Sequence, residues 1–270
     1  MEILETIRNR RSVRSFDGRD LTPRDQARLM ELFDQVPNPY GQAIRFQLLD
    51  GREHGLSSPV IVGTDLWLAG KLLRAPHAEE AFGYSFEALL LRAEAELGAG
   101  AVWIAGTLNR SAFETAMELK PEEVMPCVSP VGYPAAKMSL RETVMRKGVK
   151  AGERLPFASL FFEGDFQNAL DRERAKDLEP ILEAVRLAPS AVNKQPWRAV
   201  VIGNTVHFYE QHSKGYVDKS GWDLQKVDLG IALCHFALAA EAFEKKPLFS
   251  LDNPGIPCPD GVEYIASYSV

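Results

Sequence analysis

The chain has 270 residues, of which 46% are apolar and 25% are charged, and its formal net charge is −6. This is the composition of a globular protein that can bury a sizeable core. The acidic balance argues against general nucleic-acid binding, which requires a basic surface. No apolar run approaches the roughly 20 residues needed to cross a bilayer, so we expect no membrane span.

The N-terminus and the cysteines bear on the compartment. Residues 1–11 carry charge throughout and lack the apolar core of a signal peptide. Cys127, Cys234 and Cys258 are far apart and form no CxxC pair. This predicts a reducing, cytoplasmic location rather than a disulfide framework. The histidines are scattered without metal-ligand spacing, and we expect no bound metal.

The first half alternates helix and strand patterns. Thr22 and Pro23 are typical of a helix N-cap and first helical position. The helix that they open has an apolar stripe, consisting of Leu29, Met30, Leu32, Phe33 and Val36. Residues 71–83 are weakly patterned and are expected to form a loop. We also expect helices at 2–9 and at 84–97, the second ended by Gly98. A capping box at 111–114 is expected to open a further helix. Strands are expected at 44–50, 60–63, 101–105 and 128–133.

The second half follows a similar plan. We expect a helix at 178–187, a hairpin of strands 197–202 and 206–209, and a helix at 224–243 that is apolar almost all round and therefore buried. LMELFDQVPNPYGQAIRFQLLDGREHG and ILEAVRLAPSAVNKQPWRAVVIGNTVHFY share one order: helix, proline-containing loop, then a strand with a glycine turn. We interpret this as an internal duplication. The alternative is coincidence between two ordinary α+β segments.

An arginine-rich segment, Arg10-Arg11-Ser12-Val13-Arg14, follows the first helix. In an extended chain, alternate side chains share a face, so Arg10, Ser12 and Arg14 point one way. Guanidinium groups match phosphate oxygens bidentately, and two of them with a hydroxyl make a good phosphate site. The alternative is a basic surface turn.

Two further segments carry polar or small residues where ligand contacts concentrate. In APSAVNKQPW (188–197), Ser190, Asn193 and Gln195 offer donors and acceptors on a loop. The alternative is a turn whose Asn and Ser satisfy only the local backbone. The glycines at 98–106 follow a helix and precede a strand, the reverse of the dinucleotide fingerprint. Such a strand can instead lay its backbone against a ring.

Together these segments resemble the FMN-dependent nitroreductase family, in the branch with both halves in one chain. RRSVRSF is similar to its phosphate and ribityl motif, and APSAVNKQPW is similar to its flavin-flanking loop. ELGAGAVWIAG with VSPVGYP resembles its ring-lining segment, and Arg154-Leu155-Pro156 resembles its basic phosphate element. The resemblance implies an α+β, nitroreductase-like fold with a mixed, mainly antiparallel sheet packed with helices.

The resemblance also implies site residues. Arg10, Ser12, Arg14 and Arg154 would hold the phosphate and ribityl groups, with Arg11 also counted as cofactor-binding. The isoalloxazine would be flanked by Pro189, Ser190, Ala191 and Asn193. The ring would be lined by Trp103, Ile104, Ala105 and Gly106, with a backbone N–H near Ala105 facing the flavin N5. Tyr40 or Phe82 would cover the ring or be ordinary packing.

The activity implied is electron transfer from NADH or NADPH, through FMN, to a nitroaromatic, quinone or similar small acceptor by a ping-pong mechanism. The flavin carries the chemistry, so no catalytic side chain is assigned. Alternatives are an FMN-binding sensor or carrier without turnover, and an enzyme of the same fold with another task, such as reductive dehalogenation.

The sequence departs from the family's usual arrangement. The loop pattern stands in the second half, and the second half has no arginine motif of its own. We therefore expect two intertwined nitroreductase-like halves, 1–155 and 156–270, that share one FMN site. The chain would be a monomer resembling a dimer, or a homodimer.

Overall fold

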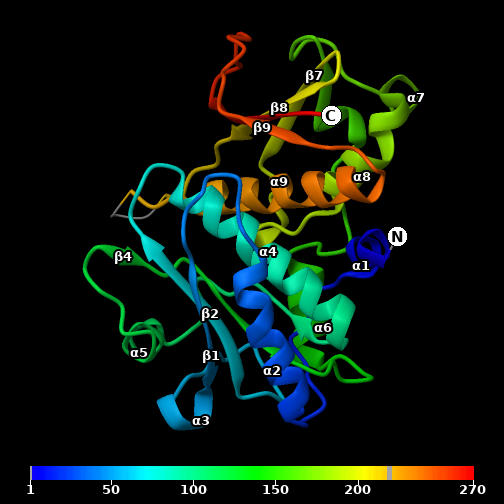
Figure 1. The fold of residues 1–270 in the computed structure, drawn as a ribbon. Helices are drawn as coiled ribbons and strands as arrows, with labels where there is room; N and C mark the ends of the chain where they lie inside the picture. The colour runs from blue at the N-terminus through cyan, green and yellow to red at the C-terminus, as the bar shows by residue number, and fades with distance from the viewer. Residues whose placement is uncertain (1, 218–220) are drawn as a thin grey trace. The chain divides into compact units, whose positions relative to one another are not determined.

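A computed structural model describes residues 2–217 and 221–270 (Figure 1). Two compact units divide the chain. The first unit is Asn9–Ala151, and the second is Gly152–Val270 with the N-terminal segment through Arg8. The expected halves, 1–155 and 156–270, remain a prediction about the duplication. Helix α1 (Glu2–Asn9) forms where expected, and up to Arg8 it belongs to the second unit.

An antiparallel sheet organises the first unit. Its strand order is β1-β2-β5-β3, with β4 paired to β2. The strands are β1 (Arg45–Asp50), β2 (Leu66–Leu73), β3 (Gly100–Ala101), β4 (Glu123–Val124) and β5 (Val128–Gly132). The inner strand β2 pairs with both β1 and β5. Because six of its eight residues are buried, it lacks the alternation typical of a half-exposed strand.

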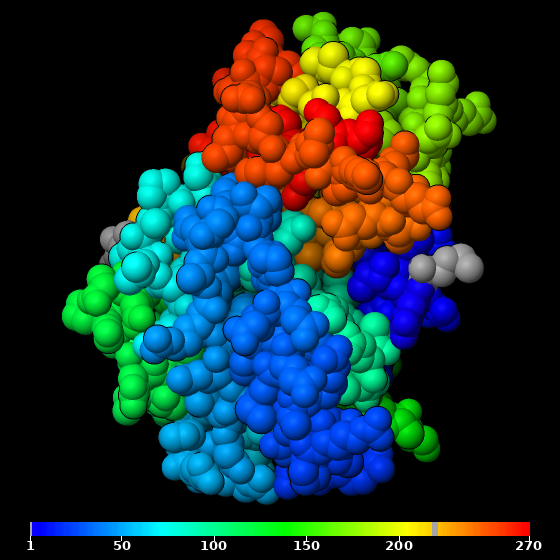
Figure 2. Space-filling model, viewed as in Figure 1, coloured from blue at the N-terminus to red at the C-terminus, as the bar shows by residue number. Residues whose placement is uncertain are grey.

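Helices cover this sheet. They are α2 (Pro23–Glu31), the 3-10 turn η1 (Leu32–Gln35), α3 (Gly51–His54), α4 (Ala78–Leu97), α5 (Arg110–Ala116) and α6 (Leu140–Gly148). The Thr22 side chain caps α2 as expected, and Gly98 ends α4 in the left-handed conformation. In Figure 1, α4 crosses in front of β2. Figure 2 shows the early segments of the unit, in blue, forming much of its surface on this face.

The second unit has its own sheet, with strand order β6-β7-β8-β10-β9. Only β6 and β7 pair in parallel among its strands. The strands are β6 (Phe161–Glu163), β7 (Trp197–Ile202), β8 (Thr205–Gln211), β9 (Leu248–Ser250) and β10 (Val262–Ser269). The helical segments are η2 (Phe157–Ser159), α7 (Arg172–Ala175), η3 (Lys176–Leu178), α8 (Glu179–Leu187), η4 (Ala191–Asn193) and α9 (Leu224–Ala242). As its composition predicts, α9 is buried nearly all round, and it packs on α8 and β8.

The two units repeat one topology. In the first, α2 leads to β1 and β2, then the long helix α4 and strand β5, with sheet order β1-β2-β5. In the second, α8 leads to β7 and β8, then α9 and β10, with sheet order β7-β8-β10. A shared element order with a shared strand order supports the internal duplication.

Several local expectations are wrong. Residues 71–83 are not one continuous loop, because they hold the end of β2, a short connection at 74–77 and the first turns of α4. The buried Lys71 side chain is stabilised there by Glu123, at 2.8 Å, and by the carbonyl of Glu118. Residues 60–63 form a turn with one bridge, from Val62 to Ser15, rather than a strand.

Three smaller expectations also fail. The strand expected at 101–105 is β3 followed by an isolated bridge between Ile104 and Val128. Helix α5 begins at Arg110, and the Ser111 hydroxyl bonds the Asn109 side chain instead of capping it. Met30 is 49% exposed and lies outside the core stripe. Strands β9 and β10 were not predicted from the sequence. No helix in the described part of the chain is long and apolar enough to cross a membrane.

Gly63 permits a close backbone approach in the first unit. Its φ is +86°, and an added Cβ would lie 2.8 Å from the carbonyl carbon of Phe16. We expect Gly63→Ala to lower the free energy of unfolding by about 3 kcal/mol or more, from clash and strain together. Gly55→Ala is the control, because Gly55 has φ +64° with no atom near the added Cβ. Urea unfolding should give a loss of only about 1 kcal/mol for the control. Equal losses would contradict the clash.

Candidate functional site

Backbone pairing fixes the arginine segment to the first unit. Ser12 bridges Ala101 in parallel, and the Val13 N–H donates to the Ala101 carbonyl at 2.9 Å. Val13 is buried, and a Cβ on Gly100 would meet it at 2.8 Å, so only glycine allows this approach. The segment is extended, as expected. Its partner in the sheet, Ala101, lies two residues before Trp103, the first of the expected ring-lining residues.

Arg14 is a half-buried cation whose donors are not fully used. Its Nε and Nη1 atoms are buried and have no hydrogen-bond partner among the described residues. Burial lowers the pKa of Arg14; Glu142 opposes this, and Arg146 and Arg10 lower it further. Arg10, Arg14 and Arg146 therefore repel one another, close to the Arg14 donors that lack partners among the described residues. An anion would relieve both costs.

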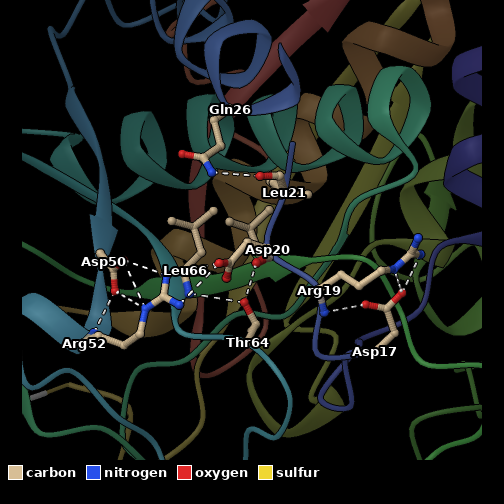
Figure 3. Close-up of polar contacts among 10 residues, drawn as sticks. Asp17, Arg19, Asp20, Leu21, Gln26, Asp50, Arg52, Thr64 and Leu66 are labelled. Atoms are coloured by element: carbon tan, nitrogen blue, oxygen red, sulfur yellow. Dashed lines mark hydrogen bonds and ion pairs between the residues drawn. The ribbon is translucent and has the colours of Figure 1, made fainter. Parts of the chain in front are cut away.

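Other arginines of this unit are already neutralised. Arg19 bonds Asp17, and Arg52 bonds both Asp50 and Asp20 (Figure 3). These side chains are exposed, where ion pairs are weak. Arg11 lies 3.5 Å from the buried Glu142 of α6. Arg14 thus differs from its neighbours in lacking a bonded carboxylate among the described residues.

Glu87 of α4 joins the arginine segment to the ring-lining segment. Its side chain is fully buried; Oε2 accepts a hydrogen bond from Trp103 Nε1 at 2.8 Å, and Oε1 lies 3.9 Å from Arg10 Nε. Trp103 packs edge-on against Phe86, with ring centroids 4.9 Å apart. Phe82 also packs on Trp103 and is fully buried, so it is a core residue rather than a cover for the ring.

The rest of the ring-lining segment leaves the sheet after Ile104. Ile104 is buried and bonds Val128 in both directions. The Ala105 carbonyl accepts from Arg110, at 3.0 Å. Among the described residues, none accepts a hydrogen bond from the Ala105 N–H. Gly106 is exposed, with open space where a side chain would lie. A backbone donor therefore remains available at the expected position.

Glu94 adds a second carboxylate on α4, two turns after Glu87. Burial raises the pKa of Glu94 from 4.5 to about 7; Arg10 and Arg11 partly offset this, while Glu87 adds to it. The charged form is thus disfavoured in the folded protein. Its folded pKa lies above its unfolded value, so its contribution to stability falls as pH rises from 4.5 to 7.

We expect Glu94→Gln to remove this pH dependence. The variant should match the wild type well below pH 4.5, where Glu94 is protonated in both states, and exceed it in stability above pH 7. Urea unfolding at both pH values measures the difference. A wild-type advantage at high pH would show that the charged form is instead stabilised by Arg10 and Arg11.

The loop 188–197 is held together inside the second unit. Ser190 Oγ accepts from the Gln195 N–H at 2.8 Å, and Gln195 Oε1 accepts from the Leu155 N–H at 2.8 Å. Asn193 donates to the Glu153 carbonyl at 3.0 Å, and Arg154 Nη1 donates to Asn193 Oδ1 at 3.3 Å. The predicted residues Ser190, Asn193 and Arg154 are thus neighbours. Their bonds are those of an ordered turn, so they do not by themselves require a ligand.

The backbone of this loop is strained. Val192, Asn193 and Gln195 have φ values of 51°, 57° and 51°. Positive φ is costly for a β-branched residue such as Val192, which is also 60% exposed. Asp228 of α9 restrains the loop, since its two oxygens lie 3.0 and 3.1 Å from the Ala191 nitrogen. Burial raises the pKa of Asp228 well above its ordinary value.

We expect Val192→Asn to stabilise the protein by about 1 kcal/mol, because Asn tolerates positive φ. The control is Val144→Asn on α6, where the valine is 70% exposed in a helix. The control should give no gain, since Asn and Val have similar helix propensity. Thermal and urea unfolding measure both. Absence of a gain at Val192 would mean that its contacts outweigh the strain.

A charged cluster that sequence spacing did not reveal lies in the second unit. Ligand-type atoms of Glu210, His212 and Asp223 lie within 4.8 Å of one another. His212 Nδ1 is 2.8 Å from Glu210, and Nε2 is 3.3 Å from Glu263. The histidine ring nitrogens already contact these carboxylates, so the cluster by itself supports no metal assignment.

Comparison with known proteins identifies the class. The fold is similar to that of a Thermotoga maritima protein described as a "putative nitroreductase", with a TM-score of 0.66 and 22% identity over 100% of this chain and 94% of that one. This likeness shows the fold. The chain matches the family described as "Putative TM nitroreductase" over residues 2–240. It therefore belongs to this nitroreductase family, and the expected fold class is confirmed.

Shorter structures match about half of the chain. Iodotyrosine deiodinase bound to FMN and 3-iodo-L-tyrosine has a TM-score of 0.42 and 16% identity, over 51% of this chain and 92% of that one. A nitroreductase-family protein from Desulfovibrio desulfuricans in complex with FMN has a TM-score of 0.40 and 20% identity, over 52% and 94%. Comparison with curated proteins gave no match.

Proposed function

We propose that this chain is an FMN-dependent oxidoreductase that passes electrons from NADH or NADPH to a nitroaromatic, quinone or similar small acceptor. Two observations support the proposal: membership of the nitroreductase family, and the buried Arg14 donors, which lack partners among the described residues. The second observation carries it, because an FMN phosphate would supply the negative charge and the acceptor oxygens that the Arg14 donors require.

The proposal assigns the phosphate and ribityl groups to Arg10, Ser12, Arg14 and Arg154. Arg10 and Arg14 offer guanidinium donors, and Ser12 offers a hydroxyl held by the Ala101 bridge. Arg11 contributes charge rather than direct contact, because its guanidinium faces Glu142. Their combined positive charge fits an anion in a partly buried environment, where such bonds are stronger than in water.

The ring contacts are proposed for small and backbone groups. The Ala105 N–H would donate to the ring edge, with Trp103, Ile104 and Gly106 beside it. Pro189, Ser190, Ala191 and Asn193 would supply the other contacts from their ordered loop. When bound, the flavin supplies hydride and electron transfer, and the protein supplies position and charge. Donors and positive charge near the ring favour its reduced form.

The remaining parts of the proposal concern turnover and assembly. Ping-pong kinetics would follow if donor and acceptor use one ring face in turn. One FMN per chain is proposed, since the arginine motif occurs once. The chain would be a monomer or a homodimer. The proposed location is cytoplasmic, because the three cysteines are far apart in the sequence and form no CxxC pair.

An absorption spectrum of the purified protein, followed by anaerobic addition of NADH or NADPH, tests this function. A flavin band that bleaches, with one FMN per chain on titration, is the expected result. A band that persists would favour a flavin-binding sensor or carrier. No flavin band, even after incubation with FMN, would overturn the proposal.

Arg14→Gln tests the phosphate assignment. Loss of charge-assisted bonds should weaken FMN binding by roughly tenfold to a hundredfold. Binding of riboflavin, which lacks the phosphate, should change little. Arg19→Gln is the control, because Arg19 is exposed and bonded to Asp17. Flavin fluorescence titration measures all four affinities. Equal losses for FMN and riboflavin would place Arg14 away from the phosphate.

A further inference from the structure

We infer that Glu87 is a positioning residue for the flavin site, which holds Arg10 and Trp103 in register. This inference rests on the proposed function. Glu87 is absent from the motifs that resemble the family, and it lies within the largely apolar helix α4. Its side chain is 0% exposed. A buried carboxylate is costly unless paired and hydrogen-bonded, so its partners are expected to matter.

The two oxygens of Glu87 serve different segments. Oε2 accepts the Trp103 indole N–H at 2.8 Å, and Oε1 faces Arg10 Nε at 3.9 Å. Trp103 begins the segment assigned to the flavin ring, and Arg10 begins the segment assigned to the phosphate. One carboxylate therefore orients a side chain from each.

The backbone already brings these segments together, two residues from each side chain. Ser12 bridges Ala101, and the Val13 N–H bonds the Ala101 carbonyl. That pairing sets the register of the two chains, but it leaves the long Arg10 side chain free to rotate. Glu87 supplies the side-chain restraint. Phe86 and Phe82 pack against the Trp103 ring. They restrain the indole whose N–H donates to Glu87.

The contact geometry leaves Arg10 able to bind an anion. Glu87 approaches the guanidinium at Nε, and among the described residues none accepts a hydrogen bond from the terminal nitrogens of Arg10. Two effects of the Glu87 charge then compete. It orients Arg10, which strengthens phosphate binding, and it repels the phosphate directly. Because Arg10 is the nearer charge and only 10% exposed, we expect orientation to dominate.

The test is the affinity of the full chain for FMN and for riboflavin in Glu87→Gln. This variant keeps an oxygen acceptor for Trp103 and removes the charge that faces Arg10. We expect FMN binding to weaken roughly tenfold, with little change for riboflavin. The matched control is Glu80→Gln, a 2% exposed glutamate on the same helix that contacts His77 instead. It should leave both affinities unchanged.

Non-additivity separates positioning from a general structural role. In an Arg10→Ala background, Glu87→Gln should have no further effect on FMN binding, because the group that it orients is gone. Trp103→Phe keeps the packing on Phe86 but removes the indole donor to Glu87. It should reproduce part of the FMN loss, and any change in riboflavin affinity measures the direct contact of Trp103 with the ring.

The outcomes are distinct. If the wild type binds no FMN, the proposed function fails and the inference fails with it. If the wild type binds FMN but Glu87→Gln binds it equally or more tightly, only the inference is overturned, since direct repulsion then dominates. If Glu87→Gln weakens FMN and riboflavin alike, or if its effect persists in Arg10→Ala, Glu87 acts on the fold rather than on Arg10. Circular dichroism and urea unfolding confirm that each variant is folded.

Discussion

The burial of positive charge in the first unit is the constraint on which the candidate site depends. Arg14 has donors without partners, Arg10 and Arg146 repel it, and Glu142 only partly compensates. A fold does not keep such a cluster for stability, because paired or exposed arginines cost less. The surrounding carboxylates moderate the cost without removing it. The cost of this cluster therefore supports the proposed phosphate assignment.

Sequence patterns located most of the scaffold because the relevant signals are local. Thr22 and Pro23 mark the start of α2, Gly98 marks the end of α4, and the apolar run marks α9. Strand β2 was missed because burial on both faces removes its alternation and Lys71 interrupts its apolar run. That lysine is stabilised by Glu123 and by the Glu118 carbonyl, partners 52 and 47 residues away that no local pattern reveals.

The same distinction applies to the candidate site. Motif residues such as Arg14 and Asn193 could be named from the sequence, because their spacing carries the signal. The partners of the motif residues could not be named. Only the fold brings Glu87 to Arg10, Glu142 to Arg11 and Asp228 to Ala191. One weak signal was available. Glu87 and Asp228 are acidic residues within largely buried helices, a combination that requires partners from elsewhere in the structure.

The two units share one topology but differ in the contacts made by the acidic residues of their long buried helices. Both units place a long buried helix on an antiparallel strand pair, and both helices carry deeply buried acidic residues. In α4 the fully buried acid Glu87 faces a cation and an indole. In α9 the buried acid Asp228 meets a backbone N–H, and burial raises its pKa. The first half thus contains the buried arginine cluster, and the second half contains the strained loop 188–197. Each copy lacks what the other retains, since the first-half loop lost its polar pattern and the second half has no arginine motif. This division of features between the halves supports the proposal of one FMN per chain rather than two.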